Sequence, residues 1–180
     1  MSLLPRFSSH APAALIVALL ALGACVNGQP PAPPLPPLQK APAFTVADAT
    51  FAQALNDMDL TQIALAQMVP THAARADLAA LGATIAKDLT ANQATLTKLV
   101  SPHAISLATK PSSADQKNID QLKGFHGAAF DRRYIRYFSR DQARMKPVLE
   151  SEIANSKNPD LVKLATDTKT LLAGYAAQLK

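Results

Sequence analysis

The sequence predicts an all-α domain, an antiparallel four-helix bundle with one short extra helix. Alanine and leucine dominate the chain, only 5% of its residues are aromatic and tryptophan is absent, a composition that favours helix over strand. From residue 48 onward, apolar residues recur at steps of three and four, the period of a helix with one buried face. With 48% apolar residues, a chain of 180 residues can bury one substantial core.

The first 24 residues have the features of an export signal. Arg6 supplies a positive charge before an apolar run, residues 13–22, that is too short to span a bilayer. Directly after it comes "LGAC", in which small residues precede Cys25. This tetrapeptide resembles the lipobox of bacterial lipoproteins, in which the cysteine is lipidated and becomes the new N-terminus. The resemblance implies that residues 1–24 are removed and that Cys25 carries the lipid.

The alternative is an ordinary signal-peptidase site with an incidental cysteine. Cys25 is the only cysteine of the chain, so it has no intramolecular disulfide partner, and a free thiol is a liability in an oxidising compartment. Both points favour lipidation. Val26 stands where lipoproteins retained in the inner membrane have an aspartate, which implies an anchor in the outer membrane and a domain that faces the periplasm.

Residues 25–43 are predicted to form a stiff tether between the lipidated cysteine and the domain. Half of the chain's 14 prolines lie between Pro30 and Pro42. Such a run adopts extended polyproline II, which rises about 3.1 Å per residue, so the tether can hold the domain roughly 50 Å from the lipid surface. A ligand for a proline-recognition groove is the other interpretation of this run.

Two long helices open the domain, which covers residues 44–180. The first has Gln62 in register with its apolar residues, and Pro70 is predicted to end it. The second covers about residues 74–100, has Asn92 in the polar position of its stripe and ends before a proline. The residues expected in the core from these helices are Phe51, Leu55, Met58, Leu65, Val69, Leu78, Leu81, Ile85, Leu89, Leu96 and Leu99.

A loop and a short helix lead to the second pair of long helices. Ser112 and Asp115, at capping-box spacing, mark the start of the short helix. The next helix covers residues 128–155 with Asp141 in line with its apolar face, and Asn158 caps the last helix. Their expected core residues are Phe130, Tyr134, Tyr137, Met145, Val148, Leu161, Leu164, Leu171, Leu172, Tyr175 and Leu179. Four amphipathic helices bury their stripes most economically in one bundle.

The domain also resembles a known family. Its best signature is Phe130-Asp131 followed three residues later by Tyr134, within "GAAFDRRY", and the spacing from "AKDL" at residues 86–89 and the closing "LLAGYAAQL" agree with it. These features resemble the bacterial domain-of-unknown-function family numbered four-one-four-two, which occurs in exported proteins described as outer-membrane proteins and is placed among the ferritin-like bundles. The resemblance covers about residues 44–180.

This family commonly carries a glutamate on its first long helix and three histidines. Carried over by position, the glutamate falls on Asp59, an Asp-His pair falls on Asp88 and Leu89, and the other histidines fall on Gln142 and Tyr175. All three imidazoles are therefore missing. A ferritin-like dimetal centre needs carboxylates and Glu-x-x-His pairs that converge on the bundle axis, and the sequence contains no Glu-x-x-His. We expect neither a bound metal nor another cofactor.

Three acids remain near the inner faces of the helices, and two interpretations of them stay open. Asp59, Asp88 and Asp141 are weak candidates for a site that holds a hard cation. The simpler interpretation is a set of hydrogen-bonded polar layers, since buried polar groups are nearly always paired. The expected partners in these layers are Gln62, Asn92, Gln142 and Tyr175.

An arginine stripe is the most unusual surface feature. Like charges at every fourth helical position repel by a few tenths of a kcal/mol each. The stripe consists of Arg132, Arg136, Arg140 and Arg144. Either neighbouring acids such as Asp131, Glu150 and Asp160 neutralise a solvated face, or the stripe binds anionic groups such as phospholipid head groups, lipopolysaccharide phosphates or an acidic polymer.

Two functions from different classes follow. The sequence lacks a nucleophile elbow and a glycine-rich phosphate loop, so no enzyme is predicted, and the net charge of +5 is too mild to imply nucleic acid. The favoured hypothesis is a non-enzymatic envelope lipoprotein, an interaction or stress-related module at the outer membrane, with anionic lipid or an envelope protein as partner. The alternative is a ferritin-like metal-binding or redox protein that uses the remaining carboxylates.

Overall fold

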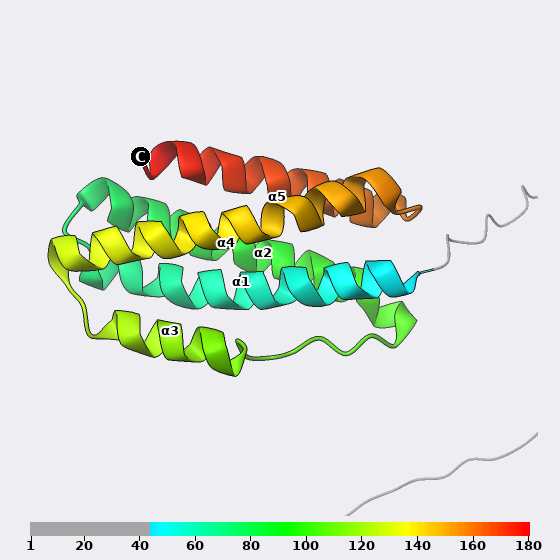
Figure 1. The fold of residues 1–180 in the computed structure, drawn as a ribbon, viewed down its shortest axis with the longest axis horizontal. Helices are drawn as coiled ribbons and strands as arrows, with labels where there is room; N and C mark the ends of the chain where they lie inside the picture. The colour runs from blue at the N-terminus through cyan, green and yellow to red at the C-terminus, as the bar shows by residue number, and fades with distance from the viewer. Residues whose placement is uncertain (1–43) are drawn as a thin grey trace, which may run out of the picture. The chain divides into compact units, whose positions relative to one another are not determined.

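The structure, a computed structural model, describes residues 44–180, so the predictions for the export signal, Cys25 and the tether lie outside the described residues. Residues 44–180 are all-helical and contain no strand (Figure 1). The elements are α1 (Val46–His72), α2 (Ala76–Val100), the 3-10 turn η1 (Ser101–His103), α3 (Ser113–Lys123), α4 (Gly127–Asn155) and α5 (Pro159–Gln178). No helix within residues 44–180 combines the length and the hydropathy that a membrane span requires.

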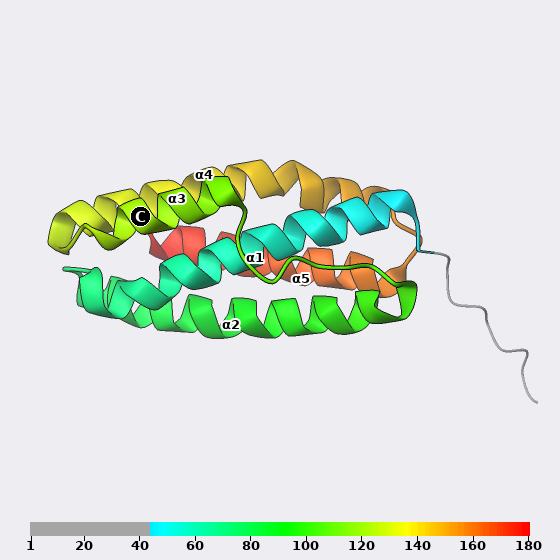
Figure 2. The same cartoon turned by 90° about the horizontal axis from the view of Figure 1, so that it is seen from below.

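The four long helices form two antiparallel hairpins. The first is α1 with α2, the second is α4 with α5, and the connection between them runs back along the bundle through a loop and α3 (Figures 1 and 2). Packing pairs α1 with α2, α4 with α5, α1 with α4 and α2 with α5. One long crossover in an otherwise antiparallel bundle is the ferritin-like connectivity. The predicted all-α four-helix bundle with a short extra helix is confirmed.

Side-chain caps fix where three of the helices begin. The Thr45 hydroxyl accepts a hydrogen bond from the backbone N–H of Asp48, whose carboxylate accepts one from the N–H of Thr45, a complete capping box for α1. Ser112 caps α3 by accepting from the N–H of Asp115, as predicted. Asn158 accepts from two backbone N–H groups of the first turn of α5, also as predicted.

The prediction that Pro70 ends the first helix is wrong. Helix α1 continues to His72 with Pro70 inside it. The proline removes one helical N–H donor, but the N–H of Ala73 donates to the carbonyl of Val69 at 3.0 Å and so closes the last turn beyond it. Val69 itself is fully buried, and we infer that this burial holds the residue before the proline in the helical conformation. Pro102, in contrast, lies in η1 directly after α2, as expected.

The core consists of the residues that the helical period predicts, with few exceptions. Leu99, Tyr137, Val148 and Leu171 are only partly buried, whereas the other predicted core residues are buried. Phe138 and Leu149 are buried as well, which widens the apolar face of α4. The apolar stripes of all four long helices therefore meet in one core.

A close approach between α1 and α2 depends on a glycine. A Cβ atom added to Gly82 would lie 2.5 Å from the Cβ of Val69, closer than van der Waals contact allows. Because both atoms are held on helical backbones, neither can turn away. The absence of a side chain at this position thus sets how closely the first hairpin packs.

We predict that Gly82→Ala lowers the free energy of unfolding by about 1–3 kcal/mol, the usual cost of overpacking a core. Urea unfolding of the variant measures it. Gly174→Ala is the matched control, since a Cβ at Gly174 in α5 meets nothing within 4 Å, and its better helix propensity should stabilise by up to about 1 kcal/mol. Equal free energies of unfolding for Gly82→Ala and the wild type would show that the stability of the hairpin does not depend on the close contact of α1 with α2 at Gly82.

Candidate functional site

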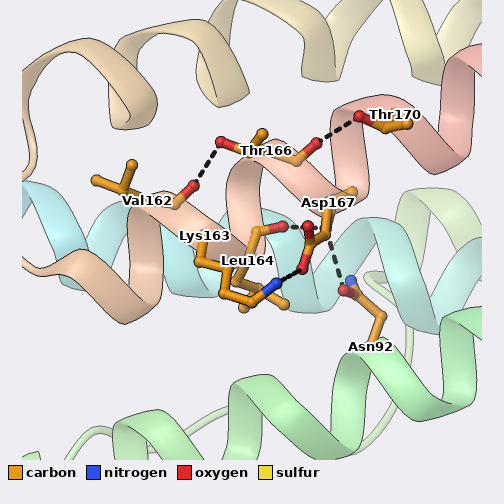
Figure 3. A network of polar contacts seen from close by, with 8 residues as sticks. Asn92, Val162, Lys163, Leu164, Thr166, Asp167 and Thr170 are labelled. Carbon is orange, nitrogen blue, oxygen red and sulfur yellow. Dashed lines mark hydrogen bonds and ion pairs between the residues drawn. The ribbon is translucent and has the colours of Figure 1, made fainter.

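Polar side chains near the middle of the bundle join α1, α2 and α5. The Nδ2 of Asn92 on α2 donates to Oδ2 of Asp59 on α1 at 2.9 Å. The hydroxyl of Thr168 on α5 lies 3.0 Å from Oδ1 of Asn92 and can donate to it. In Figure 3, Asn92 points from α2 toward α5, beside the exposed ion pair of Lys163 and Asp167 on that helix. Asn92 thus uses both ends of its amide to connect three helices.

Further hydrogen bonds join the remaining pairs of neighbouring helices. Gln62 on α1 donates to Oδ2 of Asp141 on α4 at 2.7 Å, and the Tyr175 hydroxyl on α5 donates to Oδ2 of Asp88 on α2 at 2.7 Å. Gln142 on α4 donates to the backbone carbonyl of Leu172 on α5 at 2.9 Å. Every pair of packed long helices is therefore linked, and we call this set of bonds the polar circuit. The predicted bonds of Asp59, Asp88 and Asp141 to Asn92, Tyr175 and Gln62 are confirmed, whereas Gln142 bonds to a backbone carbonyl and not to one of these acids.

Asp131 explains part of the signature "GAAFDRRY". Its carboxylate, on α4, accepts from the backbone N–H groups of Ala74 and Arg75 at 3.1 and 3.3 Å. Arg75 is the N-cap residue of α2 and provides no side-chain cap of its own, so Asp131 satisfies this helix start from another helix. Phe130 and Tyr134 are buried beside it with their rings stacked at 5.9 Å. The signature therefore holds the α1–α2 turn against α4.

One known family matches most of the chain. The family described as "Domain of unknown function (DUF4142)" matches residues 33–180. The chain belongs to the DUF4142 family. The match begins inside the predicted tether, at residue 33, rather than at residue 44. No curated protein and no solved structure matches the sequence.

The four positions to which the family resemblance assigned a glutamate or a histidine do not provide a donor set that fits a metal in this chain. Leu89 is fully buried and has no donor atom, and Gln142 and Tyr175 direct their hydrogens at other protein groups. Burial raises the pKa of Asp59 to about 8, against the hydrogen bond from Asn92, so this carboxyl is mostly protonated at pH 7. Within residues 44–180, no group of three or more His, Cys, Asp or Glu side chains is placed to hold a metal ion.

The three weak candidates for cation binding have separate partners. Asp59 is bonded to Asn92, Asp88 to Tyr175 and Asp141 to Gln62. Burial raises the pKa of Asp141, while its bond to Gln62 and the nearby Arg144 oppose the increase. These acids are therefore members of the polar circuit.

A buried pair of carboxyl groups, which the sequence analysis missed, lies at one end of the bundle. Asp48 on α1 and Glu152 on α4 are 1% and 6% exposed. Burial and the charge and contact of Asp48 raise the pKa of Glu152 to about 7. Burial also acts to raise the pKa of Asp48, but hydrogen bonds from Ser156 and Thr45 outweigh it, so this pKa is lowered. The capping-box spacing after Thr45 was the available signal for Asp48.

The structure divides the predicted arginine stripe. Arg136 and Arg140 line a pocket between α3 and α4 together with Arg133, which is not part of the stripe. Arg144 lies 3.4 Å from Asp141, and Arg132 is exposed and does not line the pocket. A step of four residues advances 40° beyond a full helical turn, so the ends of the stripe face different directions.

The acids expected to neutralise the arginines are mostly bound elsewhere. Asp131 accepts hydrogen bonds from the backbone N–H groups of Ala74 and Arg75, and Glu150 forms an ion pair with Lys169 at 3.0 Å. Within the described residues, no carboxylate oxygen lies within 4 Å of the guanidinium nitrogens of Arg133, Arg136 or Arg140. The positive charge of this pocket is therefore not cancelled by direct ion pairs in the bundle.

The raised carboxyl pKa values predict how stability depends on pH. Because Asp59 and Glu152 have higher pKa values folded than unfolded, the native state binds more protons, and the free energy of unfolding must fall as pH rises. We predict a loss that approaches about 1.4 kcal/mol per pH unit for Asp59 between pH 5 and 7, and a smaller loss for Glu152, whose folded carboxyl is about half deprotonated at pH 7. Urea unfolding at several pH values measures this slope.

Two substitutions test which carboxyl groups cause the pH dependence of the free energy of unfolding. Glu152→Gln should remove the contribution of Glu152 to the slope, and Asp59→Asn should remove that of Asp59. Glu150→Gln is the control, since Glu150 is exposed and paired with Lys169, and its slope should match the wild type. A stability that rises between pH 5 and 7, or a slope unchanged in both core variants, contradicts the assignment.

Proposed function

We propose that this DUF4142 protein is a non-enzymatic lipoprotein of the cell envelope, anchored in the outer membrane through Cys25, with its helical domain facing the periplasm. The support for the anchor is the sequence "LGAC" after a short apolar run, together with Val26. In this proposal the bundle acts as an interaction or stress-related module, and anionic lipid or an envelope protein is its partner.

The observation that carries the non-enzymatic part of the proposal is the polar circuit. Its side chains include residues at interior positions where a ferritin-like protein keeps metal ligands, and their hydrogen bonds link all four packed pairs of long helices. Oδ1 of Asp59 and Oε1 of Gln62 have no hydrogen-bond partner within the described residues, but each side chain is held by a bond through its other polar atom. These bonds fix the helices against one another and support a scaffold role for the interior. The activity of the protein is then expected on its surface.

The surface of α4 is the best candidate for contact with a partner. It carries five arginines, of which one is ion-paired with Asp141 and three line the pocket beside α3. A cationic face without direct counter-ions supports binding of an anionic partner. The alternative, a metal-binding or redox protein, requires Asp59, Asp88 and Asp141 to give up their present partners and converge on one ion.

Substitution of one residue tests the envelope proposal. In cells supplied with labelled palmitate, the wild-type chain should incorporate the label and fractionate with the outer membrane, while Cys25→Ser should lose the label and be absent from the outer-membrane fraction. Cys25 is the only cysteine, so no other thiol can take the lipid.

Val26→Asp provides the matched control, since it keeps the lipidated cysteine. It should retain the label and shift to the inner membrane if the residue after the cysteine directs sorting. A wild-type chain without label, or a Cys25→Ser chain that stays labelled, contradicts the proposal.

A further inference from the structure

The pocket between α3 and α4 has the features of a built anion site. It has a volume of about 260 Å³, and its walls come from the end of α3, the following turn and the first half of α4. Three guanidinium groups, those of Arg133, Arg136 and Arg140, line it. At spacings of three, four and seven residues, these side chains share one face of α4. Their mutual repulsion is relieved when an anion binds among them.

Aromatic rings hold two of the three guanidinium groups. The Cζ of Arg133 lies 3.7 Å from the centre of the Phe125 ring, and that of Arg140 lies 4.6 Å from the centre of the Tyr137 ring. Tyr137 is itself fixed, since its hydroxyl donates to Oδ1 of Asn118 on α3 at 2.7 Å. Stacking orients a guanidinium and leaves its in-plane N–H donors available, so less entropy is lost when an oxyanion binds.

The charge and the lining together indicate the class of ligand. A phosphate monoester carries about −1.5 to −2 charges at pH 7 and three acceptor oxygens, which suits three arginines better than a carboxylate with one charge. Leu122, Phe125 and Tyr137 add apolar surface beside the guanidinium groups. A phosphate carried on an apolar body complements both parts of the pocket.

The position of the pocket leaves it accessible within the described bundle. It lies in the half of the domain that holds the end of α3 and the start of α4, whereas α1 begins at the opposite end of the bundle (Figure 1). Glu150 and Asp131, the nearest acids in sequence that were expected to neutralise the stripe, are bound to other groups.

We propose that Arg133, Arg136 and Arg140, held over Phe125 and Tyr137, form a binding site for a phosphate monoester group. This inference deepens the proposed function, on which it rests for the location of the ligand in the envelope. Two sources share the chemistry: the head group of a lipid and free phosphate. Binding of phosphate at this pocket does not depend on lipidation of Cys25. The vesicle-binding experiment therefore tests the pocket, and the palmitate-labelling experiment tests the anchor separately.

The test uses the purified mature chain, residues 25–180, carrying Cys25→Ser, so that neither the export signal nor an attached acyl chain contributes to membrane binding. Its affinity is measured for phosphatidylcholine vesicles that contain either phosphatidic acid, a phosphate monoester, or phosphatidylglycerol, a diester, matched in surface charge. We expect phosphatidic acid vesicles to bind about tenfold more tightly, the effect of one additional charge-assisted hydrogen bond.

Variants separate the pocket from general electrostatics. Arg136→Gln with Arg140→Gln should weaken binding to phosphatidic acid vesicles by about tenfold or more. The control, Lys98→Gln with Lys157→Gln, removes the same charge from exposed lysines outside the pocket and should change affinity less than about twofold. Circular dichroism checks that both variants keep their helices.

Millimolar inorganic phosphate distinguishes the two sources of ligand. If inorganic phosphate displaces the protein from the vesicles, the pocket recognises the phosphate group alone. Binding without competition, if it is lost in the pocket variant, assigns recognition to the phosphate of a lipid together with its apolar part. Equal binding to phosphatidic acid and phosphatidylglycerol vesicles, or equal losses in the pocket and control variants, overturns the proposal.

Discussion

The rest of the structure depends on the hydrogen bonds that polar side chains make between helices inside the bundle. Asp59, Gln62 and Asp141 lie within the interior of the bundle, where an unpaired polar group costs about 1–3 kcal/mol. Their bonds, with those of Asn92 and Tyr175, connect every packed pair of long helices. Sliding one helix along its neighbour would break these bonds together, whereas apolar contacts would re-form in a new register. The polar circuit thus specifies the register of the helices, while the apolar core supplies most of the stability.

These interior hydrogen bonds also explain why the candidate site lies on the surface of the bundle and not in its core. In a ferritin-like bundle, inward carboxylates and imidazoles form a centre on the bundle axis. Here the corresponding positions hold Asp59, Leu89, Gln142 and Tyr175, and the polar groups among them bond to protein groups. The unneutralised charge lies instead on the outer face of α4, next to α3. The short helix on the crossover, together with the turn after it, therefore supplies one wall of the phosphate site proposed above.

Helical period and cap residues were sufficient to predict the five helices and nearly all of the core, because both are local properties of the sequence. The contacts between particular helices were not predictable, since they depend on how closely the helix backbones approach each other. The approach of α1 and α2 at Val69 and Gly82 is an example. Glu152 was missed because glutamate is rarely buried, and nothing local indicates its contact with Asp48. The pocket was only half predicted. Spacing by four found Arg136 and Arg140, but Arg133 joins them through a spacing of three and through its contact with Phe125.

The most direct test of the polar circuit is the free energy of unfolding of the purified protein in urea, measured after exhaustive dialysis against a chelator and again with iron, manganese or zinc added. A ligand that binds only the native state raises this free energy in proportion to the logarithm of its concentration. If the hydrogen bonds between protein groups hold the interior without a metal, the values agree within error. A free energy that falls by several kcal/mol in the chelator and returns with one of these metals would contradict the account.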